Sequence, residues 1–591
     1  MRTAERVLNV IRERGQRGLP LERLYRLLFR RDLYLVAYAK LYRNAGAMTP
    51  GVTAETVDGM SLAKIDAIIA ALRSETYRWT PVRRRYIPKK NGKRRPLGVP
   101  TWSDKLLQEV IRLLLEAYYE PQFSSRSHGF RPGRGCHTAL RDVVRQGKGT
   151  KWFVEGDIAA CFDRIDHTVL LGIVREKVHD GRFVRLLAGL LEAGYLEEWR
   201  WNATLSGTPQ GGVISPLLAN LVLDKLDRYV EHTLVPTNTR GSRRKPYPPH
   251  AALLAVSRRA RRSGDRAKAE RAFKDAQALP SKDPADPSYR RLWYVRYADD
   301  FLLGFIGPKA EALDIKQQLA TSLRDELKLE LSEAKTLVTH ARDQTARFLG
   351  YEVHAQHADC KHDHRGQRAI NVGIGLRVPR DVVTRNVATY SRNGKPVHLT
   401  QRVADSAYSI VAQYQAEYGG VVQYYQLAYN LWVLQSLKWA AVVSLVKTLA
   451  QKLRLPCPQV YRRFQRTVPT PHGTRKVLEV QLDRGPTKRA LVARFGGVPL
   501  VRNPHATVMD APRVVWSGRS ELVDRLLAEK CELCGTGDGP MEVHHVRKLA
   551  DLTGRSRWER VMAARRRKTL VVCERCHATI HAGRYDGPAL S

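Results

Sequence analysis

Two apolar runs that end at aspartates constrain the fold of this chain more than any other feature. The segment WYVRYADDFLLGF, residues 293–305, predicts two strands joined by a tight turn that carries Asp299 and Asp300. A second apolar run, within KWFVEGDIAACFDRIDH at 151–167, ends at Asp157. Burying carboxylates beside apolar strands is costly unless a cation compensates their charge. If these strands are neighbours, Asp157 and Asp299 can share two Mg²⁺ ions about 3.5 to 4 Å apart, an arrangement suited to phosphoryl transfer. An Asp-Asp turn alone would be weak evidence, because solvated hairpins also carry it.

The charge of the chain points to a polyanionic partner. The 591 residues include 100 Lys and Arg against 58 Asp and Glu, a formal net charge of +42, and 43% are hydrophobic, which excludes a disordered polycation. Nucleic acid is the largest class of such partners, because each neutralised phosphate releases counterions. An anionic membrane is the competing class. The longest apolar stretch, Trp439 to Val446, is shorter than the about 18 residues that a bilayer span needs, so we expect no membrane partner.

The hydrophobic pattern divides the chain into several regions. Residues 1–80 predict basic helices, and strand-like runs alternate with helical ones from 82 to 353, as in an α/β or α+β body. Residues 381–464 predict helices with an aromatic and leucine core. Residues 470–520 are basic and poorly periodic, which fits a linker or a small accessory domain. We therefore expect a multidomain protein.

Residues 236–291 interrupt the alternating pattern of the body. They hold 15 basic and five acidic residues and several prolines, which indicates a surface insertion with a short helix at 251–278. Such a charged run is either a solvated surface or a nucleic-acid contact, and the sequence leaves both open.

Two cysteine pairs near the C-terminus predict a metal site. Cys531 and Cys534 form one pair and Cys573 and Cys576 the other, with 38 residues between them, a spacing that suits four thiolates around one structural Zn²⁺. The other four cysteines are scattered singly, which fits a reducing cytosol rather than a disulfide framework. We expect a cytoplasmic, bacterial protein without a signal peptide.

Four histidines surround the second cysteine pair in a pattern typical of a second metal site. His544 and His545 follow the first pair on a predicted strand, and His577 and His581 lie four residues apart on one face of a predicted helix. Four histidines within 38 residues are too many for satisfied core positions. A structural zinc knuckle that grips DNA is the alternative interpretation.

Five ordered motifs resemble the reverse transcriptases of group II introns. They are SHGFRPGRGCHTAL at 127–140, DIAACFDRIDH at 157–167, GTPQGGVISPLLANLVLDKLD at 207–227, YADD at 297–300 and FLGYEV at 348–353. Residues 424–463 are similar to the thumb, or maturase, domain of this family. The resemblance implies a multidomain α+β protein: a right-hand polymerase with fingers and an antiparallel palm sheet, followed by an α-helical thumb.

By resemblance, Asp157, Asp299 and Asp300 are the polymerase carboxylates. The first two would ligate both Mg²⁺ ions, and Asp300 would be a supporting charge. Lys335, in LKLELSEAKTLV, matches a lysine that can protonate the departing pyrophosphate.

The resemblance also implies a site for deoxynucleoside triphosphates. Phe162 would exclude a 2′-OH, and Gln210 and Gly211 would line the nucleotide pocket. RRRYIPKKNGKRRPLGVPT at 83–101 predicts a β-hairpin in the fingers, whose Lys89 and Arg95 would grip the triphosphate. A core position for Phe162 and a solvated hairpin are the alternatives.

The C-terminal residues resemble an HNH nuclease, a ββα-metal module. His544, His577 and His581 would hold one catalytic Mg²⁺ or Mn²⁺, and His545 would be the general base that activates water. Many HNH enzymes carry an Asn shortly before the second cysteine pair to orient this base. The stretch RRRKTLVV at 565–572 has none.

The resemblance gives an expected domain order and function. We expect an N-terminal helical extension of the fingers (1–80), fingers and palm (81–355), thumb (356–470), a DNA-binding linker (471–520) and the HNH domain (521–591). The protein would bind its intron RNA to assist splicing, nick target DNA and copy the RNA by target-primed reverse transcription. Two alternatives stay open: a splicing maturase without significant polymerase or nuclease activity, and a defence or retron-type reverse transcriptase. The sequence also leaves open whether the protein is a homodimer.

Overall fold

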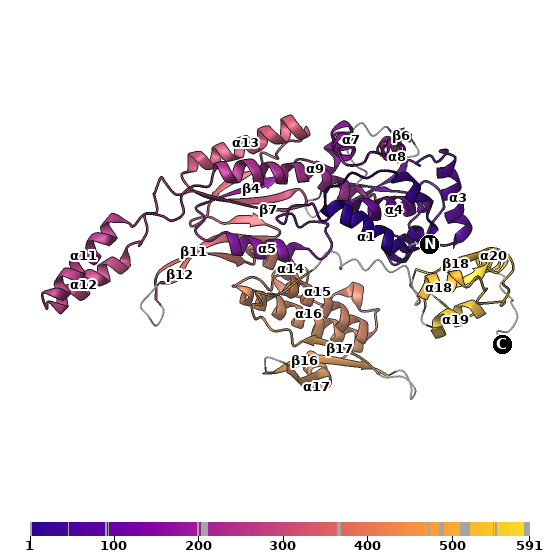
Figure 1. Cartoon of the computed structure of the whole chain (residues 1–591). Coiled ribbons are helices and arrows are strands. Elements are labelled where there is room, and N and C mark those ends of the chain that lie inside the picture. Colours follow the sequence, from indigo (N-terminus) through magenta and orange to yellow (C-terminus); the bar gives the residue numbers. More distant parts are fainter. Residues whose placement is uncertain are drawn as a thin grey trace.

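Figure 1 shows a computed structural model in which a central sheet and its helices join a helical N-terminal part, a protruding arm, a thumb and a small C-terminal domain. The described residues are 3–44, 46–88, 92, 94–197, 200–202, 211–362, 368–470, 473–483, 490–508, 521–547, 549, 552–565 and 567–583. For 200–202, 358–362 and 368–372 only the backbone is described. This architecture is the multidomain α+β fold that the sequence predicted.

The central sheet has four antiparallel strands in the order β7, β8, β4, β9. Their bounds are Arg291–Tyr297 (β7), Asp300–Ile306 (β8), Trp152–Asp157 (β4) and Leu337–His340 (β9). Successive side chains point to opposite faces, and both faces are buried. Val154 and Leu303 pack in one hydrophobic core, and Phe153 and Leu302 in a second. Burial on both sides explains why the apolar runs are nearly continuous instead of alternating.

Different elements cover the two faces of this sheet (Figure 1). Helices α9 and α13 lie on one side, and α5 with the long hairpin β11–β12 lies on the other. The bounds are Ser215–Tyr229 (α9), Lys309–Leu327 (α13), Cys136–Gln146 (α5), Ala346–Phe348 (β10), Tyr351–His362 (β11) and Arg368–Arg377 (β12). A short helix α6, Cys161–Arg164, follows β4 directly. We call the sheet and these helices the palm.

The N-terminal part is helical, as its leucine pattern predicted. Its helices are Ala4–Gln16 (α1), Arg31–Leu41 (α2), Leu62–Arg73 (α3), Trp102–Tyr119 (α4), His167–Arg175 (α7) and Gly181–Glu192 (α8), with a two-residue strand β1 at Met60–Ser61. A mixed sheet in the order β3, β2, β5, β6 completes it, with bounds Arg94–Val99, Val82–Pro88, Tyr195–Glu197 and Arg200–Asn202. β2 and β3 pair antiparallel from Arg83 opposite Val99 to Pro88 opposite Arg94, which confirms the predicted hairpin strands. The predicted turn at Asn91 lies outside the described residues.

The insertion forms a helical hairpin that protrudes from the palm (Figure 1). Instead of one short helix, it contains α11, Pro248–Arg262, and α12, Arg266–Ala278, which pack on one another. Gly264 has φ +78° between them, and the Asp265 side chain accepts a hydrogen bond from the Lys268 N–H at the start of α12. The buried contact uses small residues, Ser257, Ala260, Ala269, Ala272 and Ala276. We call this hairpin the arm.

The thumb combines helices with a small sheet. Its helices are Arg380–Ala388 (α14), Ala407–Tyr424 (α15), Gln435–Leu453 (α16) and Cys457–Phe464 (α17), and a two-strand ribbon lies at Ser391–Arg392 (β13) and Lys395–Pro396 (β14). Three antiparallel strands follow: Gln465–Thr470 (β15), Gly473–Leu482 (β16) and Leu491–Gly496 (β17). The sequence indicated a linker or a small accessory domain at 470–520, but β16 and β17 pack on α15 and share its core. Within the described part of the chain, Leu431–Leu453 alone meets a length-and-composition test for a membrane span, and half of its most apolar window is buried in the protein.

The C-terminal domain has the ββα arrangement that the sequence predicted. Strands β18, Met541–His545, and β19, Thr569–Cys573, pair antiparallel, and α20, Glu574–His581, follows at once. Helices α18, Glu521–Leu527, and α19, Arg557–Arg565, flank them. The N-terminal strand β1 pairs with the free edge of β18, so the sheet order is β1, β18, β19. The domain therefore docks on the N-terminal part, and one hydrophobic core includes residues of both.

Candidate active sites

The palm sheet brings the predicted carboxylates together at one end. In the β7–β8 hairpin the turn consists of Ala298, in a left-handed conformation with φ +54°, and Asp299. In the β4–β8 ladder Asp157 lies directly opposite Asp300. Opposed residues of a ladder project from the same face, so these two side chains are neighbours. The prediction that the two strands adjoin is confirmed.

Electrostatics at this cluster favours a bound cation. Burial raises the pKa of Asp300 to about 7, and the nearby charges of Asp299 and Asp157 contribute. The pKa of Asp299 is also raised, chiefly by burial and then by Asp157, although Lys335 and Arg95 oppose the change. Neighbouring carboxylates repel one another when ionised, which raises their pKa. A bound divalent ion supplies the positive charge that relieves this repulsion. The three side chains therefore fit Mg²⁺.

A fully buried arginine braces the turn that carries Asp299. Arg296 Nη2 lies 2.6 Å from Asp227 Oδ2, and Nη1 donates to the Ala298 carbonyl oxygen at 2.8 Å. On the other side of the turn, a Cβ added to Gly129 would lie 2.4 Å from the Ala298 nitrogen, so only glycine allows this approach. We did not select Arg296 or Asp227 from the sequence, although an arginine inside an apolar strand is a signal that it needs a buried partner.

Lys335 lies beside the carboxylates, where the resemblance placed it. Its Nζ is 2.7 Å from Asp157 Oδ2. This hydrogen bond is the main cause that raises the pKa of Lys335, so the side chain is protonated at neutral pH. With 67% of its side chain exposed, the ammonium group is also accessible to a ligand.

The fingers hairpin faces the same cluster. Arg95 lies on β3 opposite Ile87, and its charge acts on Asp299. Gly211 has φ +102°, and a Cβ there would lie 2.7 Å from the Gly98 carbonyl oxygen of β3. The predicted nucleotide residues Arg95 and Gly211 are thus on adjoining segments. Lys89 and Gln210 lie outside the described residues.

Phe162 lies on α6, the short helix after the strand that ends at Asp157. The side chain is half-buried, and its ring meets that of Phe130 edge to face with centroids 6.1 Å apart. Burial raises the pKa of Cys161, its neighbour in the chain, and the charges of Asp299 and Asp157 contribute. Phe162 therefore belongs to the segment next to the carboxylates, and its role against a 2′-OH stays a prediction.

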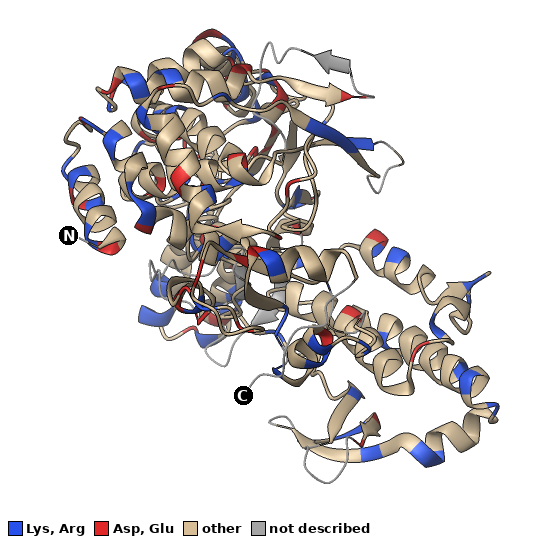
Figure 2. Ribbon diagram, turned by 90° about the vertical axis from the view of Figure 1, so that its right-hand side faces the viewer, with Lys and Arg blue, Asp and Glu red and all other residues tan. Residues whose placement is uncertain are grey.

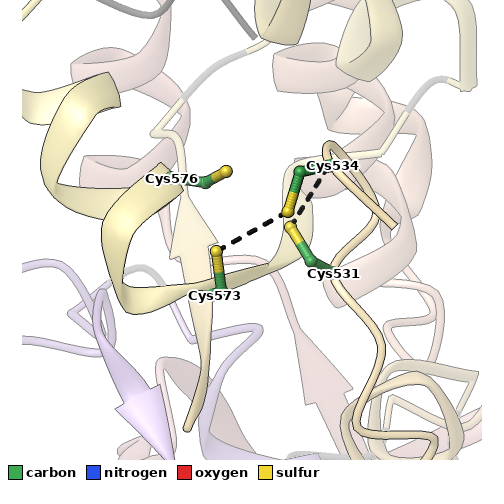
Figure 3. Close-up of side chains that lie close together, drawn as sticks. All are labelled: Cys531, Cys534, Cys573 and Cys576. Atoms are coloured by element: carbon green, nitrogen blue, oxygen red, sulfur yellow. Dashed lines mark hydrogen bonds between the residues drawn. The ribbon is translucent and has the colours of Figure 1, made fainter. Parts of the chain in front are cut away.

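The four cysteines of the C-terminal domain converge on one point, as Figure 3 shows. Their Sγ atoms all lie within 4.8 Å of one another, and those of Cys534 and Cys573 are 3.8 Å apart. Burial opposes ionisation of Cys531, but the N–H groups of Cys534 and other residues outweigh it and lower the pKa of this thiol to about 7. Four converging thiols with one already acidic fit Zn²⁺.

The histidines of the ββα unit form a second cluster, separate from the cysteines. His577 Nε2 and His581 Nε2 are 3.1 Å apart, and both ring nitrogens of buried His544 lack a hydrogen-bond partner. His577 Nδ1 donates to Glu542 Oε2 at 2.5 Å, which directs Nε2 into the cluster. Imidazole nitrogens that converge in this way fit a divalent metal ion.

Two residues of the N-terminal part enter this cluster, and no pattern in the sequence indicated either of them. Asp58 belongs to the cluster with His544, His577 and His581, whose ligand atoms all lie within 4.8 Å. Burial works against ionisation of Asp58, but the facing His544 and His577 dominate and hold its pKa far below the usual range. The hydroxyl of Tyr38, on α2, lies 3.0 Å from His545 Nε2. Tyr38 and His545 are 507 positions apart and Asp58 and His577 are 519 apart, separations that no local pattern can reveal.

His545, the predicted general base, is a neutral imidazole. Burial is the main cause that lowers its pKa to about 3. The asparagine of many HNH enzymes is absent from 565–572, and the ring of His545 shares a hydrogen bond with the Tyr38 hydroxyl instead.

Comparisons with known proteins follow the same division of the chain. The family model for reverse transcriptase (RNA-dependent DNA polymerase) matches residues 87–353. The type II intron maturase model matches 382–497, and the AI2M/AI1M-like HNH endonuclease model matches 531–577. The maturase match thus includes strands β15 to β17 with the thumb helices.

Several curated proteins are similar over long stretches. The group II intron-encoded protein LtrA of Lactococcus lactis subsp. cremoris is 38% identical, covering 94% of this chain and 95% of its own length. An uncharacterized 91 kDa protein in the cob intron of Schizosaccharomyces pombe is 31% identical, covering 94% of this chain and 69% of its own. Protein YkfC of Escherichia coli is 33% identical over 57% of this chain and 84% of its own.

Proposed function

This chain belongs to the family of group II intron-encoded proteins, and on that premise we propose how its residues carry the activities of the family. It is a reverse transcriptase and maturase homologue with an HNH endonuclease domain, which matches intron splicing and retrohoming. The observation that carries the polymerase assignment is the ladder position of Asp157 opposite Asp300, with Lys335 at 2.7 Å from Asp157.

We infer that the palm copies intron RNA into DNA from deoxynucleoside triphosphates. Asp157 and Asp299 would hold two Mg²⁺ ions, with Asp300 as a supporting charge; when bound, such ions neutralise the attacking and leaving oxygens. Arg95 binds the triphosphate from the fingers side. Lys335, protonated and exposed, gives a proton to the departing pyrophosphate.

The nucleotide is selected by contacts to its sugar and base. In this proposal the half-buried ring of Phe162 clashes with a 2′-OH and so favours deoxynucleotides. Gly211 lets the backbone approach the incoming base pair, and Gln210 and Lys89 complete the pocket in this proposal.

The C-terminal domain nicks the DNA target. His544, His577 and His581 would hold one Mg²⁺ or Mn²⁺ ion, which supplies charge stabilisation at the leaving 3′ oxygen when bound. His545, neutral because of its low pKa, takes the proton of the attacking water. Zn²⁺ at the four cysteines would tie the turn before β18 to the junction of β19 and α20 and keep these histidines in place.

Intron RNA binds over a broad basic surface. Figure 2 shows Lys and Arg distributed over several parts of the fold rather than gathered in one patch. The arm adds exposed Arg258, Arg259, Arg261 and Arg262 on α11. Folded RNA presents phosphates and 2′-OH groups over such an area, so affinity falls steeply with salt. We assign the fingers extension to 1–80, fingers and palm to 81–355 and the nuclease to 521–591. The thumb, expected at 356–470, extends through β16 and β17 to Gly496, so the DNA-binding segment expected at 471–520 overlaps its sheet.

Primer extension on an RNA template tests this function. Asp299→Asn should reduce Mg²⁺-dependent extension about 10²-fold or more, because the charge that meets the ions is lost. His545→Ala should keep extension and lose target nicking, so each variant is the other's control. Extension unchanged in Asp299→Asn would disprove the polymerase assignment, and loss of in vitro splicing in the same variant would disprove separate sites for RNA binding and polymerisation.

A further inference from the structure

The N-terminal part extends the sheet of the nuclease and carries an acidic side chain into its histidine cluster. In the pairing of β1 with β18, Met60 lies opposite Val543 and Ser61 opposite Glu542. The Gly59 N–H donates to the Val543 carbonyl oxygen at 3.1 Å, which extends this ladder by one bond. Asp58, directly before, is therefore fixed beside the strand that bears His544 and His545.

The Asp58 carboxylate meets the nuclease at four points. Oδ2 lies 2.7 Å from His581 Nε2, and Oδ1 lies 3.3 Å from His577 Nε2 and 3.4 Å from His544 Nδ1. Oδ1 also accepts the backbone N–H of His545 at 2.7 Å. Only 13% of the side chain is exposed. A buried carboxylate facing three imidazoles is an arrangement that a divalent cation stabilises.

Mg²⁺ and Mn²⁺ take about six ligands in octahedral geometry, and a catalytic site leaves some of these positions to water or substrate. His544, His577 and His581 alone would leave such positions open, and the Asp58 carboxylate would take one of them. We propose, building on the nuclease assignment above, that Asp58 is a fourth ligand of the nuclease metal ion and holds the nuclease closed until a DNA phosphate takes its place.

The packing around the general base agrees with a closed state. His545 is 6% exposed, and the rings of Tyr38 and Tyr42 lie against it with centroids 6.3 Å away in each case. Tyr38 and Tyr42 belong to the same N-terminal part as Asp58. The same docking thus fills the metal site with a carboxylate and covers the base, and a phosphodiester, also an oxygen anion, competes for the position that Asp58 occupies.

Metal binding by the full-length protein tests the ligand directly. In an Asp299→Asn, Asp300→Asn background, which disables the palm carboxylates, Mn²⁺ is titrated and bound ion is followed by electron paramagnetic resonance. Asp58→Ala should weaken Mn²⁺ binding about tenfold or more, by analogy with the loss of groups that support metal sites. Asp66→Ala is the matched control, because Asp66 pairs with Arg31 on the surface and 46% of its side chain is exposed. Equal Mn²⁺ affinity in Asp58→Ala and the control would overturn the proposal.

Hydrogen exchange tests the coupling between the metal and the docking. Mn²⁺ should slow exchange of the Gly59 amide in the parent chain and should not do so in Asp58→Ala. The isosteric Asp58→Asn keeps an oxygen that accepts the His545 N–H. It therefore distinguishes loss of the metal ligand from loss of docking caused by the smaller alanine. Metal-induced protection of Gly59 in both variants would show that Asp58 is no ligand.

The rate of DNA nicking shows whether Asp58 blocks the metal site or takes part in catalysis. With intact palm carboxylates and saturating Mn²⁺, Asp58→Ala should nick plasmid DNA several-fold faster than the parent protein, and primer extension reports whether the variant is folded. Slower nicking would overturn the closed state. Loss of Mn²⁺ affinity with no nicking by any protein would overturn the proposed nuclease function and the closure together, but would uphold Asp58 as a ligand.

Discussion

At the scale of single residues, the palm depends on three carboxylates that repel one another. Asp157 and Asp300 oppose each other in the ladder, and Asp299 lies one residue away in the turn. The burial that shapes the site also makes its charge expensive when no cation is bound. Proton uptake and Mg²⁺ binding are therefore competing ways to relieve the same repulsion.

Asp300 should link stability to pH in a defined direction. Burial and its two neighbours raise the pKa of Asp300 to about 7, whereas the pKa of Asp in an unfolded chain is about 3.9. Between these values the folded state binds more protons than the unfolded state, so this contribution to the free energy of unfolding falls as pH rises. In Mg²⁺-free buffer the melting temperature of the native protein, relative to Asp300→Asn, should decrease from pH 5 to pH 8.

Mg²⁺ provides the control for this prediction. Added at pH 8, it should restore the melting temperature of the native protein more than that of Asp300→Asn. The Mg²⁺ concentration for half-maximal primer extension should likewise rise as pH falls from 8 to 6. A pH-independent difference between the two proteins would contradict the raised pKa.

At the scale of elements, a buried ion pair next to the turn stabilises the β7–β8 hairpin. Arg296 is fully buried, pairs with Asp227 and donates to Ala298 in the turn. Removing one partner of a buried pair costs about 3 to 5 kcal/mol, whereas replacing both by apolar residues is often neutral. Arg296→Met should therefore lower the free energy of unfolding strongly, and Arg296→Met with Asp227→Leu should recover much of the loss.

Activity should separate from stability in this pair. The double variant still lacks the bond from Arg296 to the Ala298 carbonyl oxygen, so its primer extension should stay low although denaturant unfolding recovers. Full recovery of both would show that the turn does not depend on this bond.

The arm is an element whose role the salt dependence of RNA binding can decide. Arg258, Arg259, Arg261 and Arg262 are exposed, and Arg261 also lies over the ring of Phe273 on α12, 5.7 Å from its centroid. Their replacement by Gln should reduce the slope of log affinity against log salt by about 3, at about 0.7 to 0.9 for each phosphate that is no longer neutralised. Arg182 and Arg185 on α8, which pair with Glu75, are the matched positions, and their replacement should change the slope less. An unchanged slope in the arm variant would leave the arm as solvated surface.

At the scale of the whole molecule, we expect the nuclease domain to depend on zinc and on docking. Cys573 ends β19 and Cys576 lies on α20, so the thiolate cluster fixes the helix that bears His577 and His581. Cys576→Ser should release Zn²⁺, measured with a chromogenic chelator, and speed hydrogen exchange in β18 and β19. Primer extension should continue, because one face of the palm sheet, with Phe153 and Leu302, packs in a core that includes no described residue of the nuclease domain. Cys457→Ser, at a cysteine away from the cluster, should retain the zinc, and loss of extension in Cys576→Ser would contradict this independence.

Local spacing explains what the sequence could predict and what it could not. The antiparallel palm strands, the fingers hairpin and the ββα unit follow from apolar runs, turn residues and ligand spacings within a few tens of residues. Strands β16 and β17 were missed because their core lies on α15, and the arm was predicted as one helix because Gly264 is a single residue within an alanine-rich stretch. Asp58 and Tyr38 were missed because their partners lie at the far end of the chain.

The joining of the two ends has a consequence for synthesis on the ribosome. The edge of β1 and the contact face of α2 emerge early, but their partner strand β18 follows 487 residues after Asp58. At a synthesis rate of about 5 to 20 residues per second, β18 is made roughly 25 to 100 s after these surfaces. A nascent chain therefore completes its polymerase body before the nuclease can dock, and ribosomes that stop early release a protein with an open strand edge at residue 60.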